Sequence, residues 1–191
     1  MTAALILTGG AGTRMGRDKA TLEIGGETLA SRVARVVREV ADPALVVGPE
    51  AGTGLPTVDD PREGPLVAVA AGAQELAARG ARGASLVVAA DLPFLDAALL
   101  RLLVRELGEA SAAVPVANDR DQPLCACYDL VALSITVQRL TKRGARSMRE
   151  LLAALPGVRR ILPEVWLREA GSDALADVDT PADWEAALRR L

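Results

Sequence analysis

The sequence contains no histidine, only 2% aromatic residues and two cysteines, and these shortages exclude several kinds of site. Without histidine there is no Ser-His-Asp triad, no histidine-ligated haem and no imidazole general base. A structural zinc site normally needs four Cys or His ligands, which this chain lacks. Cys125 and Cys127 lie two apart in an apolar stretch, so a strand would point both to one face as buried thiols. Chemistry must therefore use carboxylates, Lys, Arg, backbone N–H groups and bound metal.

Long apolar runs and an excess of positive charge are also missing. No run of about 18 apolar residues exists and no basic region precedes the first apolar stretch, so we expect neither a membrane span nor a signal peptide. The formal net charge of -3 argues against a general nucleic-acid binder. We therefore expect a soluble, cytoplasmic protein without nucleic-acid or membrane partners.

What the sequence does contain is an alternation of strand and helix patterns over 191 residues. Strands are predicted at residues 3–7, 44–47, 57–58, 85–90, 112–116 and 124–128, and helices at 29–40, 66–78 and 96–107. Two further helices are predicted to begin after Ser147, with Glu150 completing a capping box, and after Thr180, with Pro181 and Asp183 in the first turn. The alternation predicts an α/β fold: a single three-layer Rossmann-like domain, residues 1–191, with a mostly parallel sheet and helices on both faces. Ligands bind such sheets at the carboxyl ends of the strands.

The first strand is followed by a glycine-rich segment, residues 7–19, with four glycines and three cations. Glycines let backbone N–H groups approach phosphate oxygens, and Arg14, Arg17 and Lys19 can add charge-assisted hydrogen bonds. No Gly-Lys-Ser/Thr closes the segment as in a Walker loop, and Met15 occupies the third glycine position of the dinucleotide pattern. We expect a triphosphate site here; the alternative is a flexible glycine-rich turn.

Carboxylates follow two of the predicted strands. Asp91 comes directly after residues 85–90, where it could hold Mg2+ or simply end the strand as a turn or N-cap residue. Asp59 and Asp60 precede Pro61. The sequence Asp-Asp-Pro is also common in ordinary solvated turns.

In their order along the chain, these motifs resemble those of the molybdenum cofactor guanylyltransferases of the MobA family, within the nucleotide-diphospho-sugar-transferase-like nucleotidyltransferases. That family's Leu-Ala-Gly-Gly, Arg-Met-Gly and Lys pattern matches residues 7–19 except at Thr8, where Ala is usual. Its Asp-x-Pro-Phe/Tyr metal motif resembles residues 91–94. An acidic residue shortly before Gly-Pro-Leu resembles Asp60.

The resemblance implies transfer of GMP from GTP to the phosphate of molybdenum-molybdopterin, with release of pyrophosphate and Mg2+ as cofactor. It implies that the nucleotide is bound by Leu7, Thr8, Gly9, Gly10, Gly12, Lys19, Gly48, Asp60 and Asp91. Lys19, Arg14 and Asp91 would be the catalytic residues, with Asp91 also holding the metal. Gly48 stands where the family often has Asn, so a side-chain contact would be missing there.

Three later segments resemble the family's acceptor-binding motifs. The implied residues are Arg120, Gln122, Pro123, Arg146, Asp177 and Asp179. The last two stand where the guanylyltransferases have Asn, and an acidic pair repels a phosphate unless a cation lies between them. A solvated basic turn around Arg146 and a capping role for Asp179 are the plainer interpretations.

Other functions stay open at this point. The Gly9-Gly10 pair favours GTP by resemblance, whereas a molybdenum cofactor cytidylyltransferase or another small-molecule phosphate nucleotidyltransferase is the nearest alternative. A nucleotide-binding module without turnover is the second, and a dinucleotide-binding oxidoreductase the third. We expect a monomer or weak homo-oligomer.

Overall fold

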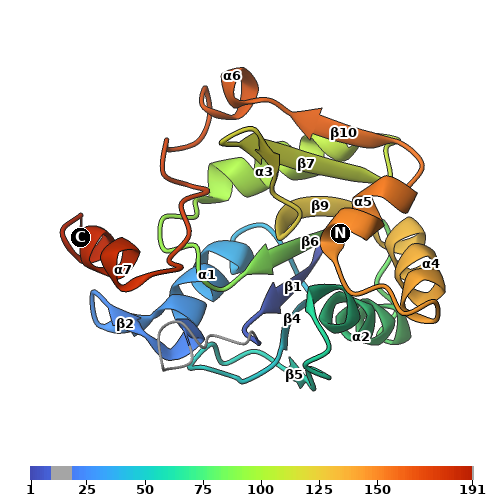
Figure 1. Ribbon diagram of the computed structural model, residues 1–191, viewed down its shortest axis with the longest axis horizontal. Helices are drawn as coiled ribbons and strands as arrows, with labels where there is room; N and C mark the ends of the chain where they lie inside the picture. The colour runs from blue at the N-terminus through green and yellow to red at the C-terminus, as the bar shows by residue number, and fades with distance from the viewer. Residues whose placement is uncertain (10–18, 191) are drawn as a thin grey trace.

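A central sheet organises the computed structural model, which describes residues 1–9 and 19–190 (Figure 1). Its strands follow the order β10-β7-β9-β6-β1-β4-β5. Their bounds are β1 Ala3–Leu7, β4 Ala44–Val47, β5 Thr57–Val58, β6 Ala84–Ala89, β7 Ala112–Ala117, β9 Cys125–Asp129 and β10 Val158–Ile161. Short β8 (Arg120–Asp121) pairs with the end of β7, and β2 (Glu23–Ile24) forms a separate hairpin with β3 (Glu27–Thr28). Only β8 and β9 run antiparallel to their neighbours in the main sheet, so the mostly parallel sheet that the sequence predicts is confirmed.

Helices cover both faces of this sheet. They are α1 Leu29–Arg38, α2 Pro65–Ala78, α3 Ala97–Leu107, α4 Leu130–Thr141, α5 Met148–Ala154, α6 Pro163–Trp166 and α7 Pro181–Leu188. One face packs against α1 and α3, the other against α2, α4 and α5 (Figure 1). This arrangement confirms the predicted three-layer α/β class. Within residues 1–9 and 19–190, no helix has the length and apolar character needed to cross a membrane.

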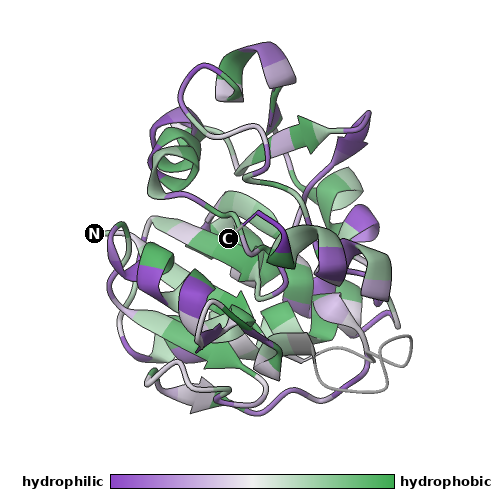
Figure 2. Cartoon of the chain, turned by 90° about the vertical axis from the view of Figure 1, so that its left-hand side faces the viewer, coloured by the Kyte–Doolittle hydropathy of each residue, from purple (hydrophilic) through white to green (hydrophobic). Residues whose placement is uncertain are grey.

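The central strand β1 is buried on both faces, which explains its uninterrupted apolar sequence. Ile6 belongs to the core on the α1 and α3 side, whereas Leu5 and Leu7 belong to the core on the α2 side. Complete burial of a side chain such as Leu5 or Ile6 stabilises the fold by roughly 1.5–3 kcal/mol. Figure 2 shows the strands of the sheet mostly in the colour of apolar residues and the surrounding helices in a mixture of apolar and polar colours.

The two cysteines lie in β9 and are free and buried, as predicted. Both side chains belong to the core on the α1 and α3 side, which confirms that they point to one face. Burial raises the pKa of each thiol from 9.0 to about 12. Both therefore stay protonated and behave as small apolar groups at neutral pH.

Side-chain caps begin the helices that the sequence located. Asp96 accepts a 2.8 Å hydrogen bond from the Leu99 backbone N–H at the start of α3. The capping boxes predicted at Ser147 and Thr180 are both present. Such a cap typically contributes about 1 kcal/mol, so these helix starts are set locally.

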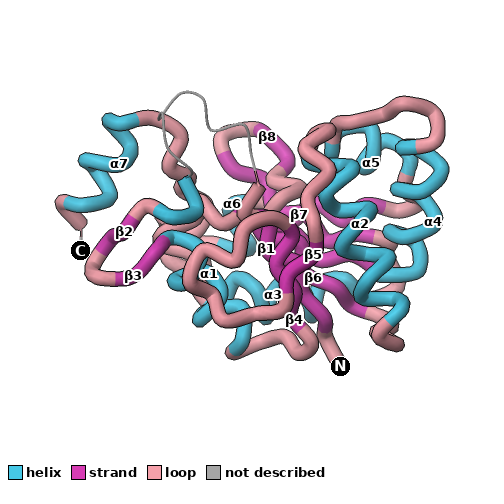
Figure 3. Tube along the Cα trace, turned by 90° about the horizontal axis from the view of Figure 1, so that it is seen from below, coloured by secondary structure: helices cyan, strands magenta, loops and turns pink. Residues whose placement is uncertain are grey.

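The C-terminal helix α7 packs against the β2–β3 hairpin, an arrangement that the sequence did not predict. Val178 before α7 is buried with Ile24 of β2 and Leu29 of α1, and Trp184 packs against this group. Figures 1 and 3 both show α7 beside the hairpin, away from the central sheet. After α6, the chain therefore crosses the molecule to the β2–β3 hairpin, which follows the glycine-rich segment in sequence.

Candidate active site

Four parallel strands end at one edge of the sheet, and the candidate nucleotide-binding residues follow them. Because β1, β4, β5 and β6 are mutually parallel, their carboxyl ends lie at the same edge. The residues that follow these ends are Thr8, Gly9, Gly48, Asp60 and Asp91. Backbone hydrogen bonds join neighbouring strand ends: Gly48 N–H donates to the Val58 carbonyl, and Ala90 N–H donates to the Leu7 carbonyl. The fold thus brings the sequence-predicted positions of the nucleotide site together.

Part of the predicted triphosphate site lies outside the described residues. This holds for Gly10, Gly12 and Arg14. Lys19 begins the short 3-10 helix η1, Lys19–Thr21, which contacts α1. The described residues on either side of this segment are Gly9, at the edge of the sheet, and Lys19, next to α1.

Gly48 occupies a position where backbone leaves no room for a side chain, and a side chain at Gly9 would require Asp60 to move. A Cβ on Gly48 would lie 2.6 Å from the Gly9 nitrogen and 2.8 Å from Thr8 Oγ1, and Gly48 has a φ of +114°. A Cβ on Gly9 would overlap Asp60 Oδ2. Both glycines therefore allow the ends of β1, β4 and β5 to approach one another closely.

Asp60 forms the turn that its sequence predicts and also lies against Gly9. Its Oδ1 accepts a 2.8 Å hydrogen bond from the Arg62 backbone N–H, which is the local turn expected of an Asp at this position. Its Oδ2 faces the backbone of Gly9. The turn thus holds a carboxylate against the first residues of the glycine-rich segment, whereas Asp59 is exposed.

Asp91 lies beside the C-terminal motif, although the two are far apart in sequence. The Val178 backbone N–H donates to the Asp91 carbonyl at 3.0 Å, which places Asp177 and Asp179 on either side of the residue bound to Asp91. Asp183 Oδ2 accepts from the backbone N–H of Asp179 at 3.1 Å, as part of the cap of α7. The N-cap of α7 is Thr180 and not Asp179, which takes part in the cap only through its backbone N–H.

The carboxylates near Asp91 do not form a closed metal cage. In the described part of the chain, no group of three or more Asp, Glu or Cys side chains is arranged to hold an ion. Mg2+ commonly takes only one or two protein carboxylates and completes its coordination with water and substrate phosphates. Asp91, half-buried at the end of β6, fits that donor set.

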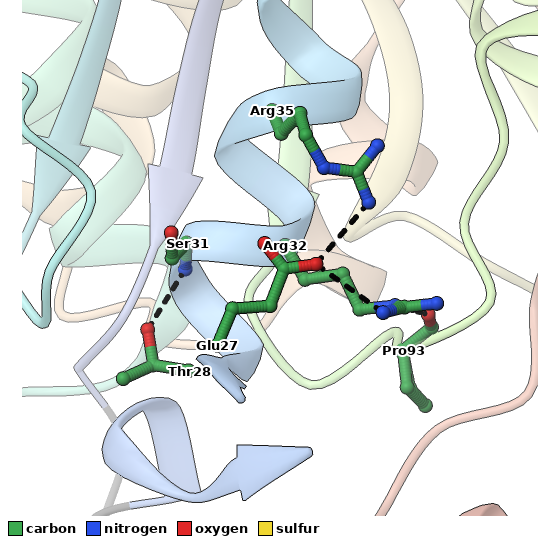
Figure 4. Close-up of polar contacts among 6 residues, drawn as sticks. All are labelled: Glu27, Thr28, Ser31, Arg32, Arg35 and Pro93. Atoms are coloured by element: carbon green, nitrogen blue, oxygen red, sulfur yellow. Dashed lines mark hydrogen bonds and ion pairs between the residues drawn. The ribbon is translucent and has the colours of Figure 1, made fainter. Parts of the chain in front are cut away.

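An arginine of α1 holds the loop that contains Asp91. Arg32 Nε donates a 2.7 Å hydrogen bond to the Pro93 carbonyl, two residues after Asp91. Its guanidinium also pairs with Glu27 at 3.2 Å, and Arg35 pairs with the same Glu27 oxygen (Figure 4). Thr28 caps α1 at its start by accepting from Ser31 N–H, which fixes the turn that presents Arg32. Nothing in the sequence marks Arg32 as part of the site, because the contact depends on tertiary packing.

The segment containing Gln122 and Pro123 reaches the same edge from the other half of the sheet. It precedes β9, and because β9 is antiparallel to β6, its beginning lies where β6 ends. Gln122 Nε2 donates within its own turn, to the carbonyls of Ala117 at 3.3 Å and Arg120 at 3.4 Å. The Gln122 amide therefore braces the hairpin, while Arg120 is exposed on β8.

Arg146 lies beside the segment that follows Asp60, residues 63–66. Its guanidinium donates to Glu63 Oε2 at 2.8 Å, and its carbonyl accepts from Leu66 N–H at the start of α2. Among residues 1–9 and 19–190, no hydrogen bond or ion pair joins it to Arg120 or Gln122. The predicted acceptor residues thus reach the site from separate sides.

Comparisons with known proteins agree with this geometry. The MobA-like NTP transferase domain matches residues 4–159. The chain is 39% identical over 173 residues to a probable molybdenum cofactor guanylyltransferase of Opitutus terrae, covering 85% of each chain. It is 37% identical over 193 residues to the protein of the same description from Mycobacterium avium, covering 96% of this chain and 93% of that one.

Solved structures show the same fold at lower identity. Molybdopterin-guanine dinucleotide biosynthesis protein A from Archaeoglobus fulgidus matches with a TM-score of 0.79 and 21% identity, over 100% of this chain and 98% of that chain. The 2-C-methyl-D-erythritol 4-phosphate cytidylyltransferase from Thermus thermophilus matches with a TM-score of 0.70 and 20% identity, over 100% and 98% of the two chains. The fold is thus common to proteins named for different nucleotides, whereas the 37% and 39% identities are to proteins named probable molybdenum cofactor guanylyltransferase. On the family match and these relatives, the chain belongs to the MobA-like NTP transferase family.

Proposed function

We propose that this protein is a molybdenum cofactor guanylyltransferase, which transfers GMP from GTP to the phosphate of molybdopterin. A phosphate oxygen of the acceptor attacks the α-phosphorus of GTP, a new P–O bond forms, and the bond to the β-phosphate breaks to release pyrophosphate. A phosphate monoester with a second pKa of about 6 is largely dianionic at neutral pH. The reaction therefore needs no catalytic base, which suits a chain without histidine.

One observation carries this proposal: the start of the glycine-rich segment and Asp91 follow neighbouring strands at one edge of the sheet, in a chain closely related to guanylyltransferases. Such enzymes act mainly by positioning and charge neutralisation. The Gly9 N–H donates to the Val47 carbonyl, so backbone N–H groups after Gly9, with Arg14 and Lys19, would bind the phosphates. Asp91 would hold Mg2+, which when bound neutralises phosphate charge.

The acceptor would bind between the two halves of the site. Gln122 and Pro123 approach from the β9 side, and Asp177 and Asp179 flank the residue bonded to Asp91. The guanidinium groups of Arg120 and Arg146 would supply positive charge for the acceptor phosphate.

A nucleotide panel tests the reaction. Pyrophosphate release is measured with GTP, CTP, ATP and UTP, each with and without molybdopterin and with and without Mg2+. We expect release only with GTP, molybdopterin and Mg2+ together. Preferential use of CTP would instead support a cytidylyltransferase, the second candidate favoured by the shared fold. Tight GTP binding without release for any acceptor would contradict catalysis.

Replacement of the metal-binding carboxylate tests the site. Asp91→Asn should lower turnover by at least about a hundredfold, the loss expected when one preorganised electrostatic group is removed. Asp59→Asn is the matched control, because Asp59 is an exposed aspartate near the same edge. Circular dichroism verifies that both variants fold, and wild-type turnover in folded Asp91→Asn would refute the assignment.

A further inference from the structure

The loop after β4, residues 48–54, is held in place by side chains from three different elements. Thr8 Oγ1, at the end of β1, donates to the Pro49 carbonyl at 2.7 Å. Thr28 Oγ1, before α1, donates to the Ala51 carbonyl at 2.6 Å, and Arg38 at the end of α1 donates to the Thr53 carbonyl at 2.9 Å. We call residues 48–54 the β4 loop; these hydrogen bonds hold its backbone in place beside the candidate site.

Thr8 provides the attachment nearest to the nucleotide. Its side chain is 4% exposed, and a buried hydroxyl requires a hydrogen-bond partner. Besides the Pro49 carbonyl, the hydroxyl has the Val47 carbonyl at 3.3 Å, a much longer contact. Within the described residues, no other group donates to the Pro49 carbonyl. Without the Thr8 hydroxyl, the Pro49 carbonyl loses its hydrogen bond to the end of β1.

The position of the β4 loop is passed on to Asp60 through two glycines. Gly48 lies against Thr8 Oγ1 and the Gly9 nitrogen so closely that a Cβ would overlap both. Gly9 in turn lies against the Asp60 carboxylate. Because proteins are packed without free space at such contacts, a shift of the β4 loop displaces Gly9 and Asp60 as well.

The charge of the β4 loop indicates which half of the nucleotide the loop faces. The β4 loop contains no Lys or Arg, and its charged residue is Glu50. Hydrogen bonds from the backbone N–H groups of Gly54 and Gly52 hold the pKa of Glu50 below its usual value, so it stays ionised. Asp60 adds a second acidic group beside Gly9, whereas Arg38 bonds the other end of the loop at Thr53 and Gly54. The end of the loop near Gly9 therefore disfavours phosphate groups. The predicted phosphate-binding cations lie instead in residues 14–19.

We propose that Thr8 is a positioning residue: by bonding the Pro49 carbonyl it places the β4 loop and Asp60 against the nucleoside half of the substrate. This inference rests on the proposed function in taking that substrate to be GTP. The hydroxyl acts through the backbone of residues 48 and 49 and does not bind the phosphates.

Binding measurements on two near-isosteric variants test this role. Thr8→Val keeps the shape and removes the hydroxyl, whereas Thr8→Ser keeps the hydroxyl. By calorimetry, Thr8→Val should weaken GTP binding about tenfold, the order expected for one lost buried hydrogen bond. Binding of inorganic triphosphate should change less than about twofold, and Thr8→Ser should bind GTP nearly as the wild type does. In turnover, KM for GTP should rise by a larger factor than kcat falls.

A control variant separates this role from general destabilisation. Ser111→Ala also removes a hydroxyl that donates to a proline carbonyl, that of Pro156, but before β7 at the opposite edge of the sheet. It should leave the GTP dissociation constant unchanged. Thermal unfolding verifies folding of each variant, and if Thr8→Val does not fold, Thr8→Ala replaces it in the same measurements.

Several outcomes would overturn the proposal. They are unchanged GTP binding by Thr8→Val, equal weakening for GTP and triphosphate, and a Thr8→Ser variant as weak as Thr8→Val. A wild-type protein that binds GTP without releasing pyrophosphate refutes the proposed function and leaves the Thr8 comparison intact. If the wild type prefers CTP, the comparison is made with CTP, and failure to bind any nucleotide refutes both.

Discussion

The Gly9 backbone and the Asp60 carboxylate are in direct contact at the edge of the sheet, with no space between them for a side chain. Gly9, which follows β1, thus limits where the carboxylate of Asp60, which follows β5, can lie. The contact joins β1 and β5, which do not pair directly because β4 lies between them. It makes the place of Asp60 dependent on the first glycine of the nucleotide-binding segment.

Gly9→Ala should therefore displace Asp60 and impair both stability and binding. Overpacking of this kind costs about 1–3 kcal/mol in unfolding free energy, and we expect GTP affinity to fall by about tenfold. Urea unfolding and calorimetry measure the two effects.

The double variant Gly9→Ala/Asp60→Gly distinguishes crowding from other causes. It removes the group that the new methyl meets, so stability should recover in part, although the Arg62 N–H loses its acceptor, while GTP affinity stays low. The control is Gly171→Ala, whose Cβ would meet Asp96 Oδ2 at an ordinary 3.6 Å. Equal losses in Gly9→Ala and Gly171→Ala would contradict the steric explanation.

A second prediction concerns the arginine that holds the Asp91 loop. Arg32 donates to the Pro93 carbonyl and pairs with Glu27, whereas Arg35 only pairs with Glu27 (Figure 4). Arg32→Gln should lower the rate of pyrophosphate release by about tenfold, because a charge-assisted hydrogen bond contributes about 1.5–3 kcal/mol and its loss frees the loop after Asp91.

Arg35→Gln is the matched control for Arg32→Gln and should turn over at nearly the wild-type rate. The Mg2+ concentration for half-maximal rate should rise in Arg32→Gln alone. A similar fall in both variants would mean that Glu27, and not the Pro93 carbonyl, is the partner that matters.

Most of the central sheet could be predicted from the sequence because its strands are continuous apolar runs. Residues 3–7 and 44–47 were placed with the bounds observed, the strand predicted near 57–58 is present, and the strand predicted at 85–90 is displaced by one residue. Parallel strands buried on both faces produce such runs. The β2–β3 hairpin was missed because two-residue strands show no periodicity, as was α4, whose apolar residues follow β9 without a break.

The candidate site, like the fold, could be predicted from the sequence only in part. The positions that follow strand ends, such as Gly48 and Asp91, could be predicted, because topology alone brings the carboxyl ends of parallel strands together. The contact of Arg32 with Pro93 joins residues 61 positions apart and depends on the orientation of one side chain. The bond from Thr8 to Pro49 is of the same kind. No local sequence pattern encodes such contacts, so only the folded arrangement reveals them.

A third prediction concerns Gly72, through which α2 packs against the two strands that carry Thr8 and Gly48. A Cβ on Gly72 would lie 2.7 Å from a methyl carbon of Leu5 and 2.7 Å from one of Val47. Gly72→Ala gains about 1 kcal/mol in helix propensity, but overpacking costs about 1–3 kcal/mol, so we expect a net loss of stability in urea unfolding.

A second substitution, at Val47, tests whether overpacking causes the loss of stability in Gly72→Ala. Val47→Ala in the Gly72→Ala background should recover part of the lost stability, although Val47→Ala alone creates a cavity and destabilises. Because Leu5 and Val47 also set the spacing of β1 and β4 just before Thr8 and Gly48, Gly72→Ala should weaken GTP binding more than it weakens binding of inorganic triphosphate. A Gly72→Ala variant more stable than the wild type would mean that α2 can move outward freely, and the spacing of these strand ends would then depend on the sheet alone.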